Sequence, residues 1–260
     1  MKKRFFGALF VLAFVFCSVQ SAFASSIDNL DVMQNELYNI DFSKEPTDDQ
    51  KALLNQYYKA DSERVFNEKF AEQLFIKDSV NVKNALKSGY GNSSFVKEEN
   101  SQIIEPLMSR SSSSLGTVGD ILVTYSFSSF GIDVAATGHA AIVHTNSNNT
   151  VESFPNGGVR VYPNDWKKKS KVYGVRVRGA SYNDYKNAAA YAIRQADARK
   201  PYNKNFFNKG TTAKFYCSQL VWRAWKNQGF EVDRMNLGNY EPVSPAELVG
   251  GKGTYVFYKR

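Results

Sequence analysis

The stretch Phe215-Tyr216-Cys217-Ser218-Gln219-Leu220-Val221-Trp222 places a cysteine at the start of an amphipathic segment. Its apolar side chains recur at helical spacing and Gly229 supplies a stop, so we expect a helix that begins at Cys217. The inward-facing residues are Leu220, Val221, Ala224 and Trp225. Unpaired amides and the positive end of the helix dipole favour a thiolate there. Position alone leaves two interpretations open, a nucleophilic cysteine and a small buried hydrophobe.

The first 24 residues have the pattern of a secretory signal peptide. Residues 2–4 are basic, Phe5 to Val19 are mostly apolar, and Ala22-Phe23-Ala24 is a small-x-small cleavage site. Phe16 is too bulky to precede a lipoprotein anchor at Cys17, and the apolar run is too short for a confident membrane span. We therefore expect a protein that is secreted to the extracellular space or the cell wall, without stable membrane insertion.

Removal of residues 1–24 changes both the cysteine content and the charge. It leaves Cys217 as the one cysteine, which excludes an internal disulfide and favours a reactive thiol or an intermolecular bridge. The whole chain has 33 Lys and Arg, three of them in this segment, against 25 Asp and Glu, so the remainder carries +5. That charge suits an anionic envelope polymer, or only solubility. No basic stripe interleaved with aromatic residues marks a nucleic-acid site, and export argues against one.

Residues 25–114 form a helical N-terminal region that ends in a Ser-rich linker. Thr47 and Gln50 have capping-box spacing, and the apolar pattern predicts a second helix after Asp61-Ser62. The linker closes with Ser111 to Ser114, so we place the domain boundary there. The region is interpreted first as a packing or spacer domain; a pro-segment or a wall-targeting module remain alternatives.

Residues 115–260 have the pattern of a single α+β domain. Short strands separated by turn residues come first, and helices follow, which predicts an antiparallel sheet packed on helices. The expected strands are 119–125, 138–144, 150–154, 159–161, 172–177 and 254–259. Ser181 and Asp184 cap a helix that ends before Pro201, and residues 244–248 form a capped helical turn.

Both histidines of the chain, His139 and His144, fall in one predicted strand. Five residues apart, they point to opposite faces, so only one can serve a given site. His139 follows Gly138 at the strand start, where a catalytic group can be exposed, whereas His144 lies beside an Asn-rich turn. A Cys nucleophile needs such an imidazole and a third polar group that orients it.

Glu152 is the best candidate for that third group, although a solvent-facing Glu152 is also compatible with the pattern. It lies between Val151 and Ser153 on the hairpin strand that follows His139. A tight turn at Asn146-Ser147 puts Glu152 and His139 on the same face but not directly opposite, so a twist or bulge must bring them together. The chain has no zinc-ligand set, HExxH, GxSxG or P-loop, and we expect neither a metal nor an organic cofactor.

Five blocks occur in a characteristic order: Gly119-Asp120-Ile121-Leu122, Gly138-His139-Ala140-Ala141-Ile142-Val143, Val151-Glu152-Ser153, Pro201-Tyr202-Asn203 and Tyr216-Cys217-Ser218-Gln219-Leu220-Val221. This order resembles the permuted NlpC-type papain-fold enzymes, the YiiX-like group, which are related more distantly to lecithin retinol acyltransferase. The resemblance covers residues 119–260 and implies a circularly permuted papain-like fold in which histidine precedes cysteine. It implies Cys217 as nucleophile, His139 as general base and Glu152 as orienting residue.

Three tyrosines are further candidates for substrate binding. Tyr125, after the first strand, is the candidate for the second oxyanion donor beside the Cys217 backbone amide. Tyr202 and Tyr216 could line a cleft or fill the core. Asn203 departs from the carboxylate that we expect after the Pro-Tyr pair, which leaves substrate preference open.

These observations predict a secreted cysteine amidase or endopeptidase acting on peptidoglycan stem peptides or related amino-acid amides through a thioester. One alternative is an acyltransferase or esterase with lipid or acyl-ester substrates. A second alternative is a catalytically inactive cell-wall-binding module. The sequence leaves the bond cleaved, the oligomeric state and the role of the N-terminal region open.

Overall fold

The computed structural model describes residues 29–67, 70–75, 77, 113–125 and 138–260. The predicted signal peptide and most of the predicted Ser-rich linker lie outside these residues. Among the helices that are described, none is both long enough and apolar enough to cross a membrane.

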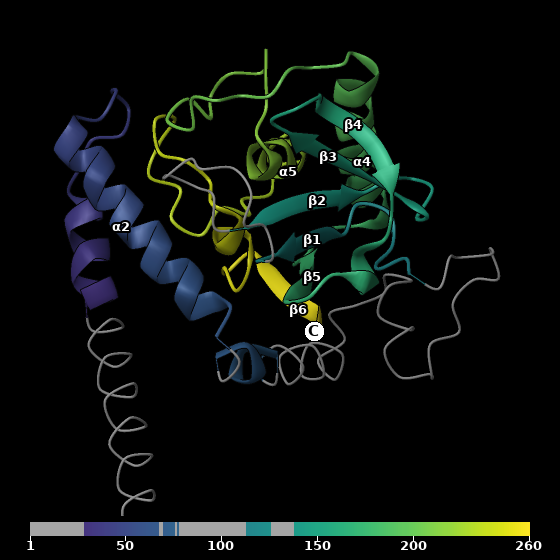
Figure 1. The fold of residues 1–260 in the computed structure, drawn as a ribbon, viewed down its shortest axis with the longest axis horizontal. Helices are drawn as coiled ribbons and strands as arrows, with labels where there is room; N and C mark the ends of the chain where they lie inside the picture. The colour runs from purple at the N-terminus through teal and green to yellow at the C-terminus, as the bar shows by residue number, and fades with distance from the viewer. Residues whose placement is uncertain (1–28, 68–69, 76, 78–112, 126–137) are drawn as a thin grey trace, which may run out of the picture.

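The C-terminal half of the chain builds one six-stranded antiparallel sheet with strand order β4-β3-β2-β1-β5-β6 (Figure 1). The strands are β1 Ile121–Thr124, β2 His139–Val143, β3 Asn149–Phe154, β4 Gly158–Pro163, β5 Val172–Val177 and β6 Thr254–Lys259. Alternating and β-branched runs between turn residues predict each of these strands. With the helices described next, the sheet makes an α+β fold, as the sequence predicts.

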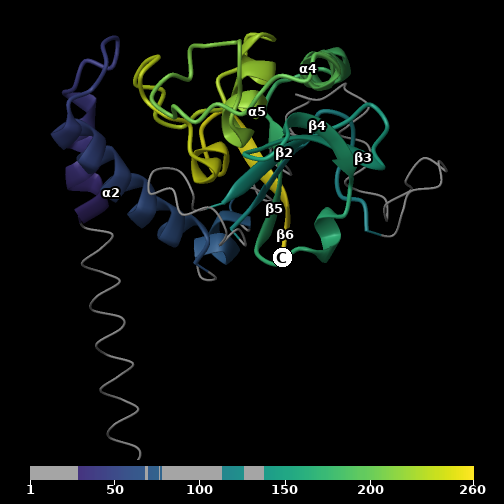
Figure 2. The same cartoon turned by 45° about the horizontal axis from the view of Figure 1, so that its top comes forward.

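Helices α4 (Tyr182–Asp197) and α5 (Cys217–Lys226) cover one face of the sheet (Figure 2). The predicted capping box is present in α4, where Ser181 and Asp184 exchange hydrogen bonds. Small alanines on its buried side let α4 lie close to β3 and β4, while α5 packs on β2 and β3. The packing of α5 brings the N-terminus of that helix, and with it Cys217, to the start of β2.

Both faces of the sheet are buried. On the helical face, Trp225 of α5 is fully buried and meets the Tyr185 ring edge-on, with ring centroids 4.7 Å apart. On the opposite face, Trp166 of the short 3₁₀ helix η1 (Trp166–Lys168) packs with Leu122 and Ala141. The central strands therefore carry no exposed residue, and a polar side chain in them needs a buried partner.

Helix α2 (Asp48–Val65) begins at the predicted capping box of Thr47 and Gln50. The helix runs through Asp61 and Ser62 to Val65, and the predicted second helical segment follows in residues 70–75 and 77, so the break falls a few residues later than predicted. The side chains of Asp61 and Ser62 are fully buried, and the Asp61 carboxylate accepts hydrogen bonds from Arg64 of the same helix and from Arg234. Arg64 and Arg234 supply the hydrogen bonds that the buried Asp61 carboxylate needs, so Asp61 can lie inside the helix although the sequence pattern predicts a helix end there.

The described N-terminal residues pack against the C-terminal domain. Side chains of residues 29–38 and of α2 share an apolar cluster with Met235. At the other end of α2, the Tyr173 hydroxyl donates a hydrogen bond to the Val65 carbonyl oxygen, at 2.6 Å. Helix α2 runs along one side of the sheet domain in both views (Figures 1 and 2).

Candidate active site

Cys217 is the first residue of α5 and is 8% exposed. Burial raises the pKa of its thiol, but hydrogen bonding and charge from His139, together with the backbone N–H groups of Ala140 and Ser218, hold that pKa below its ordinary value. The helix start is fixed by Gln219, whose Oε1 accepts from the Tyr216 backbone N–H at 3.1 Å. The site therefore favours the thiolate, which is the reactive form of cysteine.

His139 is the first residue of β2 and is buried between two aromatic rings. The rings of Phe154 and Trp166 stack on the imidazole with centroids 4.4 and 6.0 Å away. Its Nε2 lies 2.7 Å from Glu152 Oε2, so the other ring nitrogen is the one that can serve Cys217. Burial lowers the pKa of His139, but hydrogen bonds and charge from Cys217 and Glu152 outweigh it and raise the pKa to about 9. The imidazole is therefore protonated at neutral pH.

Glu152 is held by two donors besides the imidazole. Its Oε1 accepts from the Thr150 hydroxyl and, at 3.0 Å, from Trp166 Nε1. Burial raises the pKa of this carboxyl, yet the hydrogen bonds from His139, Thr150 and Trp166 lower it below the ordinary value. Thr150 and Trp166 were not among the residues predicted for the site. The alternation of Thr150 and Glu152 on one strand face could have indicated the first, but nothing local indicates Trp166.

The register of β2 and β3 explains the contact between His139 and Glu152. Ile142 pairs with Val151 and Val143 with Thr150, which is the register that a turn at residues 146–147 predicts. Continued along the strands, it places Phe154 rather than Glu152 opposite His139. The contact is therefore diagonal on one face, and the length of the glutamate side chain spans it.

The other predicted residues lie in different surroundings. Tyr202 forms a β-bridge with Phe215, which lies two residues before Cys217. Burial is the main cause that raises the pKa of the Tyr202 phenol, and the charge of Cys217 adds to it. Tyr216 is fully buried, with its hydroxyl accepting from the Val243 backbone N–H at 3.0 Å. The charge of Cys217 contributes to the raised pKa of both phenols.

Tyr125 packs on side chains outside the group formed by Cys217, His139 and Glu152. Its ring lies 5.0 Å from that of Phe66, at the end of α2, and beneath the Lys171 ammonium. Among the described residues, no hydrogen bond joins Tyr125 to Cys217 or His139, so the structure does not bring it into the group. His144 lies just beyond β2, where its Nδ1 accepts from the Asn146 backbone N–H at 2.8 Å.

Comparisons with known proteins concern the part of the chain that carries these residues. Residues 117–245 match the family described as permuted papain-like amidase enzyme, YaeF/YiiX, C92 family. Over these residues, just under half of the chain, the sequence is similar to that family. The permuted papain-like amidases are cysteine hydrolases, and Cys217, His139 and Glu152 all fall within the matched residues.

The fold also aligns with a solved structure, described as metalloprotein yiiX from Escherichia coli O157:H7. The two chains are 21% identical, with a TM-score of 0.43, and the alignment covers 55% of this chain and 97% of that one. No curated protein matches the chain. Helix α2 lies outside the residues matched to the amidase family.

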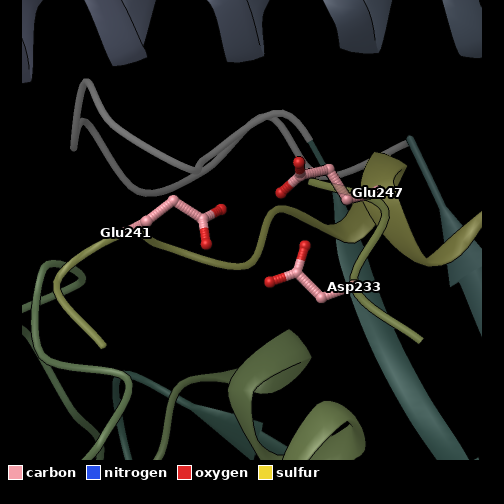
Figure 3. Close-up of side chains that lie close together, drawn as sticks. All are labelled: Asp233, Glu241 and Glu247. Atoms are coloured by element: carbon pink, nitrogen blue, oxygen red, sulfur yellow. The ribbon is translucent and has the colours of Figure 1, made fainter. Parts of the chain in front are cut away.

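A second cluster of ionisable groups lies beneath α2. It consists of three buried carboxylates, Asp233, Glu241 and Glu247, whose oxygens lie within 4.8 Å of one another (Figure 3). Among the residues that the structure describes, this is the group of side chains that could hold a metal ion. Lys209 already supplies a cation there, because its Nζ pairs with Glu241 and lies 2.6 Å from Asp233 Oδ2. The cluster thus has an internal counter-charge and lies beside α2.

Proposed function

We propose that this protein is a secreted cysteine amidase that hydrolyses amide bonds in peptidoglycan stem peptides or related amino-acid amides. One observation carries the proposal: a thiol with a lowered pKa at the start of a helix, hydrogen-bonded to an imidazole that a buried carboxylate holds at 2.7 Å. Nucleophilic catalysis by cysteine needs this chain of three groups. The match to an amidase family supports an amide rather than an ester substrate.

Acylation begins when the Cys217 thiolate attacks the carbonyl carbon of the substrate and forms a C–S bond. The carbonyl electron pair moves to oxygen, where the Cys217 backbone N–H at the helix N-terminus can stabilise the negative charge. The protonated His139 then gives its proton to the amide nitrogen as the C–N bond breaks. The amine leaves, and an acyl thioester remains on Cys217.

Deacylation uses the now neutral His139. It accepts a proton from water while the water oxygen adds to the thioester carbon, and the C–S bond then breaks. A carboxylic acid leaves, and the thiolate and protonated imidazole are restored. Throughout, Glu152 keeps Nε2 of His139 engaged, so that the other ring nitrogen faces the sulfur.

Location and charge support the choice of substrate. The N-terminal signal pattern directs the protein out of the cytoplasm, and the +5 charge of the remaining chain suits an anionic wall polymer. Stem peptides supply amide bonds in that compartment. Both points rest on the sequence, and the experiment below tests the substrate directly.

The test incubates purified protein spanning Ser25 to Arg260 with muropeptides and follows the products by mass spectrometry, with Cys217→Ala as the matched control. We expect cleaved stem peptides from the wild type and none above background from the variant. A parallel incubation with acyl esters of the same amino acids compares the two bond types. Equal product from both proteins rules out the proposed nucleophile, and ester turnover without amide cleavage rules out the proposed substrate class.

A further inference from the structure

The two residues that flank Cys217 are both anchored on Val243. The Tyr216 hydroxyl accepts a hydrogen bond from the Val243 backbone N–H at 3.0 Å, and the Ser218 hydroxyl donates to the Val243 carbonyl oxygen at 2.6 Å. Tyr216, Ser218 and Val243 are all buried. The position of the nucleophile therefore depends on one residue of a segment 26 positions later in the chain.

Helix α2 holds this segment from the other side. The Tyr58 hydroxyl lies 2.5 Å from Glu241 Oε1 and 2.7 Å from the Pro242 carbonyl oxygen. Tyr58 is 1% exposed and Glu241 is fully buried, so water cannot readily replace these contacts. A continuous series of hydrogen-bonded residues thus leads from α2 through Glu241, Pro242 and Val243 to both neighbours of the thiol.

A second route joins α2 to the same helix N-terminus. Asp61 of α2 pairs with Arg234, next to Asp233, which binds the Lys209 ammonium. The Lys209 carbonyl oxygen in turn accepts from Gln219 Nε2 at 3.1 Å, and Gln219 Oε1 caps the helix that begins with Cys217. Lys209 thus binds the acidic cluster of Figure 3 with its side chain and α5 with its backbone.

We propose that helix α2 is a positioning element of the active site, and that the Tyr58 hydroxyl holds the 241–243 segment in the conformation that places Cys217 against His139. The inference rests on the proposed role of Cys217 and assigns a role to a helix that lies outside the family match. It also opposes the pro-segment alternative, because a pro-segment is removed to activate an enzyme, whereas loss of α2 would impair this one.

The physical reason is the sensitivity of the Cys217–His139 contact to small displacements. Loss of the Tyr58 hydroxyl leaves Glu241 Oε1 and the Pro242 carbonyl oxygen without this hydrogen-bonding partner at a buried position, and the segment relaxes to find other partners. Val243 moves with it, and so do Tyr216 and Ser218. A displacement of the thiol weakens its hydrogen bond to the imidazole, which otherwise lowers the pKa of Cys217.

The test compares Tyr58→Phe with Tyr57→Phe in the full chain from Ser25. Tyr57 is an equally buried neighbour on α2, with its ring 5.7 Å from that of Tyr58. In the described residues, no hydrogen bond joins Tyr57 to Glu241 or Pro242. Two quantities are measured at a temperature where circular dichroism shows folded protein: the rate of Cys217 alkylation by iodoacetamide against pH, and kcat and KM on the cleaved amide.

For Tyr58→Phe we expect kcat about tenfold lower with KM little changed, and an alkylation midpoint shifted to higher pH. Tyr57→Phe should match the wild type in both measurements. A Tyr58→Phe protein that keeps the wild-type midpoint and kcat overturns the proposal, as does an equal effect of both variants. Alkylation needs no substrate, so an absence of amidase activity would refute the proposed function and leave this inference open to the same test.

Ser218→Ala provides a second variant if Tyr58→Phe does not fold. It removes the hydroxyl that donates to the Val243 carbonyl oxygen and should shift the alkylation midpoint in the same direction. Where Tyr58→Phe folds, the two effects should be less than additive in the double variant, because both act through Val243. An unchanged midpoint in Ser218→Ala, or full additivity in the double variant, contradicts the proposed route.

Discussion

The reactivity of Cys217 depends on two opposing effects on the pKa of its thiol, burial and hydrogen bonding. Burial alone raises the pKa of the thiol, whereas His139 and two backbone N–H groups lower it. The imidazole is subject to the same two effects in the opposite sense, since burial lowers its pKa and its two anionic neighbours raise it. Each of the two groups therefore stabilises the charged form of the other.

Replacement of His139 by alanine should raise the pKa of the Cys217 thiol. The largest lowering contributions disappear while burial remains, so the thiolate fraction at pH 6 falls. The iodoacetamide rate at pH 6 should drop at least tenfold, which corresponds to a pKa rise of about one unit. His144→Ala is the control and should leave both alkylation and amidase activity at the wild-type level; the reverse pattern would refute the assignment of His139.

Thr150→Val should weaken the orientation of Glu152 without changing the shape of the strand. It removes a hydroxyl that donates to Glu152 Oε1 and that lowers the pKa of this carboxyl. We expect kcat to fall about tenfold, the value of one hydrogen bond to a charged group. Thr145→Val, outside β3, is the control; equal kcat in both variants would show that the Thr150 contact does not matter for catalysis.

At the scale of elements, the start of α5 depends on the buried side chain of Gln219, in its first turn. The Gln219 amide caps the helix through the Tyr216 N–H, accepts from Asn203 Nδ2, and donates to the carbonyl oxygens of Lys209 and Thr211. One buried side chain thus joins the helix N-terminus to the loop that precedes it. A polar residue at this apolar helix face is understandable only through these contacts.

Gln219→Leu should therefore destabilise the protein strongly. It leaves several buried backbone and amide groups without partners, each worth about 1–3 kcal/mol. We expect the free energy of unfolding in urea to fall by about 3 kcal/mol or more. Gln228→Leu, which removes one part-buried contact with the Ala224 carbonyl beyond the other end of α5, should cost much less. Similar losses in the two variants would contradict the capping role.

At the scale of the whole molecule, the junction between α2 and the sheet domain makes stability depend on pH. Burial and the charge of Asp233 raise the pKa of Glu241 from 4.5 to about 8, against the opposing charge of Lys209. Glu247 also faces the cluster and carries a pKa raised by burial. A proton on Glu241 would let this carboxyl donate to the Tyr58 hydroxyl while Tyr58 donates to the Pro242 carbonyl.

The folded chain then keeps a proton that the unfolded chain has already lost. This contribution to stability is fully present below pH 4.5 and is lost as pH rises through about 8. The free energy of unfolding should fall over this range by up to about 1.4 kcal/mol per pH unit. In Glu241→Gln that part of the slope should vanish, which urea denaturation at several pH values can measure; an unchanged slope would show that Glu241 does not titrate there.

Sequence alone determined the parts of this protein that depend on neighbours within a turn or a hairpin. Helical spacing placed Cys217 at a helix start, and strand parity with a turn at residues 146–147 placed His139 and Glu152 on one face. Capping boxes at Thr47 and Ser181 followed from spacing alone. These features arise from local geometry, which a short window of sequence contains.

The tertiary structure decided which distant groups complete the site. Trp166 contacts Glu152 because the segment between β4 and β5 packs on one face of the sheet. The Tyr216 hydroxyl is buried in the core, where it accepts a hydrogen bond from the Val243 backbone N–H. Helix α2 continues through Asp61 because Arg234, 173 residues away, satisfies that carboxylate. Contacts of this length depend on how the packed faces fit together, and no local pattern encodes them.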